Sequence, residues 1–114
     1  MKRVLNYVFI SLLLLLGVAH TALTPVFFKN FDESFLWFAG TGLSFVFLAF
    51  LNYARVLTTL FSIRIMCAIG NLFGLLFVIC LINTGEAITL QAFVSLIVLF
   101  TLFLLSLYNF RQSQ

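Results

Sequence analysis

The stretch LTTLFSIRIMCAIGNLFGLLFVICLI, residues 57–82, contains a single charged residue, Arg64. As a helix it would be about 39 Å long. The hydrocarbon core of a bilayer is about 30 Å thick and needs about 20 apolar residues per helix. The stretch therefore predicts a transmembrane helix that is tilted or that begins in the membrane interface.

Three further segments have the same character, at residues 4–24, 34–51 and 87–107. The first is expected to end at Thr24, because Pro25 disfavours helical geometry in the residue before it. Of all 114 residues, 64% are hydrophobic and only 8% are charged, whereas about a quarter are charged in soluble domains. A soluble fold of this size could not hide so much apolar surface, so the expected solvent is lipid.

The N-terminal segment has a second interpretation. Its basic start, its apolar run and the residues Gly17, Val18 and Ala19 are similar to a secretory signal with a cleavage site. The apolar run continues past Ala19, however, and we interpret the segment as a retained first span.

Short connections determine the predicted fold. They comprise about nine residues at 25–33, about five at 52–56 and four at 83–86. Short links place consecutive helices side by side and antiparallel. The prediction is an all-α, up-and-down four-helix transmembrane bundle that forms one domain over residues 1–114.

The basic residues predict the orientation of this bundle. If both termini lie on one side, five basic residues lie there and only Lys29 lies on the other side; the five are Lys2, Arg3, Arg55, Arg64 and Arg111. The positive-inside rule then predicts cytoplasmic N and C termini, and the expected location is a bacterial inner membrane. The basic residues are scattered rather than clustered, so nucleic acid is not an expected partner.

The scarce polar residues gather at the opposite end of the predicted bundle. The only His and the only Trp of the chain, His20 and Trp37, lie there. An ionisable side chain within a span is a functional hypothesis by default. We expect an outward-facing polar pocket between the first and second helices that binds a lipid or small amphiphile, lined by His20, Thr24, Glu33, Trp37 and Thr41.

Each of these residues also has a structural interpretation. His20 can anchor a neighbouring helix, and Trp37 can lie at the headgroup level as an interfacial anchor. Asp32 is expected to cap the second helix, and carboxylates in a first turn are favoured by the helix dipole. The sharper hypothesis places Glu33 opposite His20 as an acid/base pair.

The third helix carries Gly70 and Gly74, a spacing typical of helix packing in lipid. It predicts close helix contact, including a possible homodimer or contact with another membrane protein. Asn71 is expected to bond across helices, with Thr41 or Ser44 as partner. Arg64 is expected to extend to the cytoplasmic surface.

The sequence offers little for cofactor chemistry. No spacing of His, Cys and acidic residues indicates a metal site, and one His excludes a bis-histidine haem within one chain. Cys67 and Cys80 would lie about 20 Å apart along one helix, too far for a disulfide. We predict no cofactor and no catalytic residues.

The motif HTALTP, followed by LWFAGTGL and then Asn52, resembles a pattern in small bacterial four-helix membrane proteins of DoxX-like layout. The resemblance covers residues 20–52 and implies an inner-membrane protein with no assigned reaction. The matching positions are His20, Pro25, Trp37, Gly40, Gly42 and Asn52.

Three functions therefore remain open. The first is a non-enzymatic binding or accessory role that uses the polar pocket. The second is a small proton-coupled transporter in which His20 and Glu33 titrate. The third is a structural subunit of a membrane complex that associates through Gly70 and Gly74.

Overall fold

A computed structural model describes residues 1–84 and 90–111 of the chain, with side chains up to Tyr108. The described residues form four helices and no strand: α1 (Lys2–Phe27), α2 (Glu33–Leu57), α3 (Phe61–Asn83) and α4 (Leu90–Arg111). All four are long and apolar enough to cross a membrane. The predicted all-helical class and the expected membrane character are confirmed at this level.

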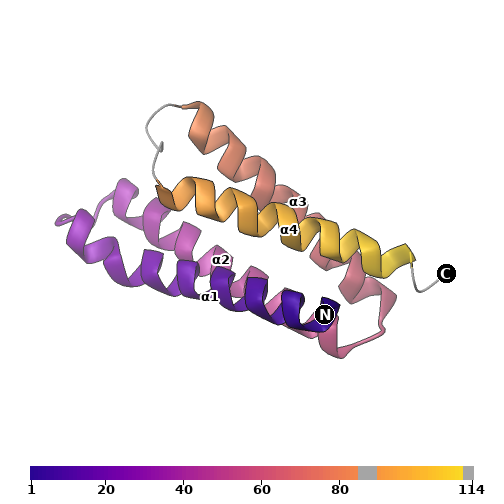
Figure 1. Cartoon of the computed structure of the whole chain (residues 1–114). Coiled ribbons are helices and arrows are strands. Elements are labelled where there is room, and N and C mark those ends of the chain that lie inside the picture. Colours follow the sequence, from indigo (N-terminus) through magenta and orange to yellow (C-terminus); the bar gives the residue numbers. More distant parts are fainter. Residues whose placement is uncertain (85–89, 112–114) are drawn as a thin grey trace.

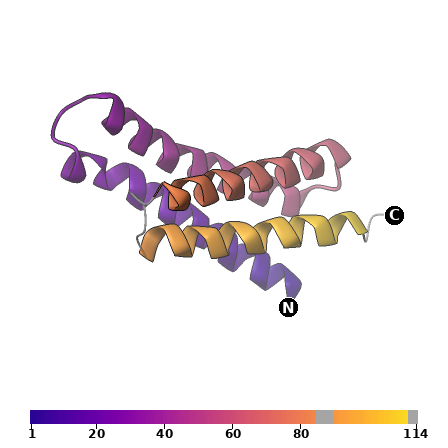
Figure 2. The ribbon, with the colours of Figure 1, turned by 90° about the horizontal axis from the view of Figure 1, so that it is seen from above.

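The molecule measures about 50 × 24 × 24 Å, and its helices form two packed layers. One layer contains α1 and α2. The other layer contains α3 and α4 and lies over the first layer (Figure 1). The view from above shows the same two pairs (Figure 2). Between the layers, α1 contacts α4 and α2 contacts α3. The loop after α1 lies at one end of the molecule, and the loop after α2 lies at the other end with the N-terminus (Figure 1).

Four predicted boundaries differ from the structure by three residues or more. The third helix begins at Phe61 rather than at residue 57, and the fourth ends at Arg111 rather than at residue 107. The first helix continues through Pro25 to Phe27. A proline there removes one backbone hydrogen bond near the helix end, where Phe28 N–H still closes on the Thr24 carbonyl at 2.9 Å. The second helix continues to Leu57, so residues 52–56 are helical rather than a loop, and the connection comprises only residues 58–60.

Other boundaries agree closely with the sequence pattern. Asp32 caps α2 as expected, because its Oδ1 accepts from Phe35 N–H at 3.0 Å. The end of α3 at Asn83 lies one residue beyond the predicted position. The start predicted for the fourth span, residue 87, lies outside the described residues.

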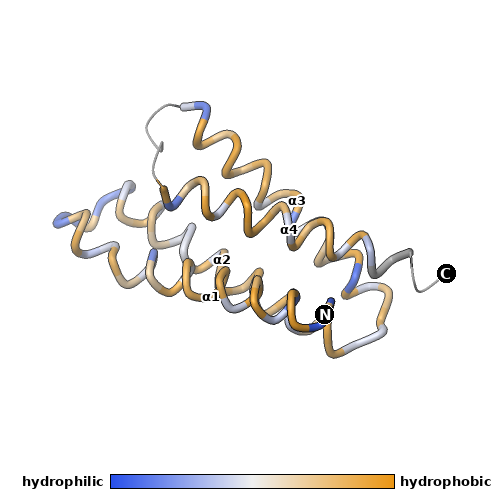
Figure 3. Tube along the Cα trace, in the orientation of Figure 1, coloured by the Kyte–Doolittle hydropathy of each residue, from blue (hydrophilic) through white to orange (hydrophobic). Residues whose placement is uncertain are grey.

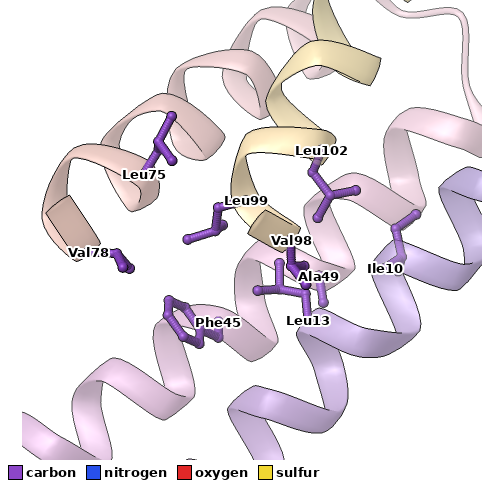
Figure 4. Close-up of a cluster of buried hydrophobic side chains, with 9 residues drawn as sticks. All are labelled: Ile10, Leu13, Phe45, Ala49, Leu75, Val78, Val98, Leu99 and Leu102. Carbon is purple, nitrogen blue, oxygen red and sulfur yellow. The ribbon is translucent and has the colours of Figure 1, made fainter. Parts of the chain in front are cut away.

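Apolar side chains from all four helices meet in one core (Figure 4). Leu13, Leu99 and Leu102 are fully buried there, and Phe45 and Val98 are nearly so. Large apolar side chains also cover the outer surface of every helix. The trace coloured by hydropathy is apolar along most of each helix (Figure 3). A surface of this kind suits a lipid environment, because it would be unfavourable in water.

The backbones of α1 and α2 approach each other closely at Gly17 and Gly42. A Cβ atom added to Gly17 would lie 2.7 Å from the Gly42 carbonyl oxygen, and one added to Gly42 would lie 2.8 Å from the Gly17 carbonyl oxygen. The absence of side chains at both positions lets the two backbones touch. Small residues allow such contact in lipid, where helix association depends on packing.

Candidate functional site

A cavity of about 710 Å³ lies at the end of the molecule where α1 meets α2. Its walls come from both layers, so it lies mainly between the two helix pairs rather than between α1 and α2 alone. Aromatic side chains dominate the walls, and polar groups are few. The polar lining residues are His20, Ser34, Trp37, Thr41, Thr84, Gln91 and Ser95.

His20 lines this cavity, and two contacts hold its ring in place. Its ring stacks on Phe38, with centroids 3.7 Å apart and an interplanar angle of 17°. Gln91 Nε2 lies 2.7 Å from His20 Nδ1. With the Gln91 amide nitrogen in this position as donor, Nδ1 accepts, and the matching neutral tautomer carries its proton on Nε2. This leaves the Nε2–H group as a donor for a bound molecule.

The remaining predicted site residues are divided between the cavity and its surroundings. Trp37 and Thr41 line the cavity together with His20. Thr24 is buried and donates to the His20 carbonyl at 3.0 Å, so it supports the helix behind the site. Glu33 is exposed and accepts from Trp37 Nε1 at 3.2 Å. The structure thus orients Glu33 toward Trp37 of its own helix.

Gln91 and Ser95 of α4 are not among the residues predicted for the site. The structure brings them into the cavity, and Gln91 is the direct partner of His20. Their spacing of four residues on one helix face gave the only signal. Nothing in the sequence indicates that Gln91 contacts His20, which lies 71 positions away.

The described lining residues of the cavity include no Asp, Glu, Lys or Arg. Among the described residues, no group of three or more His, Cys, Asp and Glu side chains is arranged to hold a metal ion. Cys67 and Cys80 are both free thiols. The cavity therefore offers hydrogen bonds and aromatic contacts, which suits an uncharged molecule with a polar head.

A second polar cluster lies in the core toward the other end of the molecule. Asn52 and Asn71 are fully buried and exchange two hydrogen bonds, of 2.8 and 3.1 Å. Asn71 thus bonds across helices to Asn52, in place of the expected Thr41 or Ser44. Thr41 and Ser44 instead donate to carbonyls of their own helix.

Arg55 belongs to the same cluster, although the sequence places it in a connecting loop at the membrane face. It is only 1% exposed. Its guanidinium donates to Asn6 Oδ1 at 2.6 Å, and Nε has no hydrogen-bond partner. Glu33, at the start of the same helix, lies about 33 Å away along the axis. This cation is therefore held by amide and carbonyl oxygens, without a carboxylate among the described residues.

The cluster joins all four helices. Asn6 comes from α1 and Arg55 from α2, while Asn71 comes from α3 and also donates to the Leu102 carbonyl of α4 at 3.4 Å. At the same end, Lys2 donates to the Tyr108 hydroxyl and lies over its ring. Groups that satisfy one another in this way fix how the helices fit together.

Gly70 and Gly74 of α3 both face Leu48 of α2. A Cβ atom added to Gly70 would lie 3.0 Å from Leu48 Cδ1, and one added to Gly74 would lie 3.2 Å from Leu48 Cδ2. Both glycines therefore let α3 approach α2 of the same chain. The predicted helix-packing role thus has an intramolecular partner.

No family model, curated protein or solved structure matches the chain. The resemblance to the DoxX-like group stays an expectation, and functional inference depends on the geometry of the cavity. That geometry is of a small helical protein with helices long and apolar enough to cross a membrane, and with a cavity whose described lining residues include no Asp, Glu, Lys or Arg.

Proposed function

We propose that this chain is a multi-pass protein of a bacterial inner membrane that binds an uncharged amphiphile and has no catalytic role. In this proposal the four helices cross the membrane up and down, with both termini in the cytoplasm. The cavity around His20 then faces the outer side. The basic residues near the termini and the position of Lys29 support this orientation.

One observation carries the proposal: the pair of His20 and Gln91 lies in a cavity with aromatic walls, and no Asp, Glu, Lys or Arg is among its described lining residues. The Nε2–H group of His20 can donate to a carbonyl or hydroxyl oxygen. Thr41 and Ser95 offer hydroxyl groups, and the aromatic walls can cover an apolar part. A charged head would lack a partner there, which favours heads that carry only hydroxyl, ester or ketone groups.

Trp37 supplies the measurement, because it is the only Trp of the chain and it lines the cavity. The protein is placed in lipid nanodiscs and titrated with 1-octanoylglycerol, which has an uncharged head and a short chain. We expect a saturable change in Trp37 fluorescence. Octanoate, with the same chain and a charged head, is expected to bind at least about tenfold more weakly, because its charge would be buried without a partner.

Variants of the pair test whether the signal comes from the cavity. We expect Gln91→Leu and His20→Leu each to weaken octanoylglycerol binding about tenfold, the effect of one lost hydrogen bond of about 1.4 kcal/mol. Thr101→Val is the matched control, since Thr101 lies on the same helix as Gln91 but bonds only the Ile97 carbonyl. An unsaturable signal, or equal binding by Gln91→Leu and Thr101→Val, would overturn the proposal.

A further inference from the structure

A second cavity, of about 690 Å³, forms a groove between α2 and α3. Aromatic rings, leucines and small residues line it, and the small residues include Gly40, Ser44 and Gly70. It shares four lining residues with the cavity around His20, namely Trp37, Thr41, Phe45 and Phe77. The two spaces are therefore neighbours with a common wall, one with polar groups and the other almost entirely apolar.

We propose that this groove holds the hydrocarbon chain of the amphiphile whose head binds at His20, and that the ligand enters sideways from the bilayer. The inference rests on the proposed function and adds the ligand class: a single long apolar chain attached to an uncharged head. The lining residues extend along α2 from Trp37 to Leu51, about 21 Å of helix axis. One leaflet of the hydrocarbon core is about 15 Å deep, so the groove can follow a chain through the leaflet.

The alternative occupant of a groove with small residues is a transmembrane helix, such as a second copy of this chain. Two features argue against it. Leu48 already lies against Gly70 and Gly74, because Cβ atoms added to them would lie 3.0 and 3.2 Å from its methyl groups. Phe47 and Phe73 also line the groove, are 68% and 65% exposed, and belong to the two helices that face each other across it. These rings hold a second backbone at a distance, whereas a hydrocarbon chain can pass between them.

Gly40 allows the groove to be blocked without disturbing the fold. A Cβ atom added there has no neighbouring atom within 4 Å, so Gly40→Leu extends into open space along the groove. Ser44→Leu is a second variant of the same kind, because Ser44 is exposed and lines only the groove. Leu43→Phe is the control, since this exposed residue of α2 lines neither space.

The experiment uses a palmitoylglycerol analogue with a photoreactive diazirine in the middle of its chain, in nanodiscs that contain the intact protein. We expect adducts on groove residues such as Phe47, Leu48 and Phe73, and we expect excess octanoylglycerol to remove them. Gly40→Leu and Ser44→Leu should each reduce these adducts about tenfold, as steric exclusion from a pocket can. Leu43→Phe should leave both the adducts and octanoylglycerol binding unchanged within about twofold.

The possible failures are distinct. If octanoylglycerol gives no saturable Trp37 signal, the proposed function fails and this inference fails with it. If octanoylglycerol binds but the adducts are spread over lipid-facing residues such as Leu15 and Phe100, only the groove inference is overturned. A change of oligomeric state in Gly40→Leu would also overturn it, because a helix would then occupy the groove.

Discussion

At the scale of single residues, two glycines of α2 that are two positions apart have opposite surroundings. Gly42 faces α1 so closely that a Cβ atom would lie 2.7 Å from Thr21 N. Gly40 faces open space at the groove. The same residue type therefore allows helix contact at one position and leaves room at the other.

This contrast gives a prediction about stability in detergent micelles. Gly42→Ala is expected to lower the free energy of unfolding by about 1–3 kcal/mol, the usual cost of overpacking. Gly40→Ala is expected to leave it unchanged or to raise it by about 0.5–1 kcal/mol, because alanine is the better helix former. Equilibrium unfolding followed by circular dichroism compares the two variants. Equal effects of both substitutions would contradict the helix contact described for Gly42.

At the scale of the helices, the pair of Asn52 and Asn71 holds α2 against α3. The two amides satisfy each other within a region that excludes solvent. If one partner is replaced by an apolar residue, the other keeps buried groups without a bond, whereas removal of both avoids that penalty.

A double-mutant cycle tests this pair. We expect Asn52→Leu and Asn71→Leu each to lower the free energy of unfolding by about 1–3 kcal/mol. The double variant should be less destabilised than the sum of the single variants, by about 0.6 kcal/mol and at most about 1.7 kcal/mol, the mean and the maximum for hydrogen bonds between membrane helices. A control cycle of Asn52→Leu with Thr101→Val should be additive, because the Thr101 hydroxyl bonds only its own helix. Additivity in both cycles would show that the two amides are not coupled.

At the scale of the whole molecule, the burial of Arg55 alters the charge balance used to predict orientation. Arg55 is held by Asn6 in the core, so it does not act as a free charge at the membrane face. Lys2, Arg3, Arg64 and Arg111 still lie on the predicted cytoplasmic side, against Lys29 on the other. The bias decreases from five against one to four against one and keeps its direction.

Reporter fusions test the proposed orientation. Alkaline phosphatase, which is active only outside the cytoplasm, is expected to be inactive when fused after Arg111 and active when inserted beside Lys29. Green fluorescent protein at the same two positions should give the opposite pattern. Active phosphatase at the C-terminus would refute the orientation and would place the His20 cavity on the inner side.

The fold was largely predictable from the sequence. Four long apolar segments indicated four helices, and Asp32 marked the start of α2. The errors arose where polar residues were interpreted as interruptions. Asn52 and Arg55 suggested a loop, yet they are helical and buried because partners on other helices satisfy them.

The candidate site was less predictable. His20, Trp37 and Thr41 were identified from their scarcity and position in the sequence, and they line one cavity. Thr24 and Glu33 come from the same part of the sequence but do not line the cavity. Thr24 donates to the His20 carbonyl, and Glu33 accepts from Trp37 Nε1. The rotation of each helix about its own axis separates these groups, and local spacing does not specify that rotation when most faces are apolar.

The sequence by itself determined four segments that are long and apolar enough to cross a membrane as helices, because hydrophobic length is a local property of the chain. Only the tertiary structure decided which polar groups meet: His20 with Gln91, Asn52 with Asn71, and Arg55 with Asn6. Such pairs depend on how helices rotate and pack. Lipid gives little hydrophobic preference for one apolar helix face over another, so close packing and hydrogen bonds determine the arrangement.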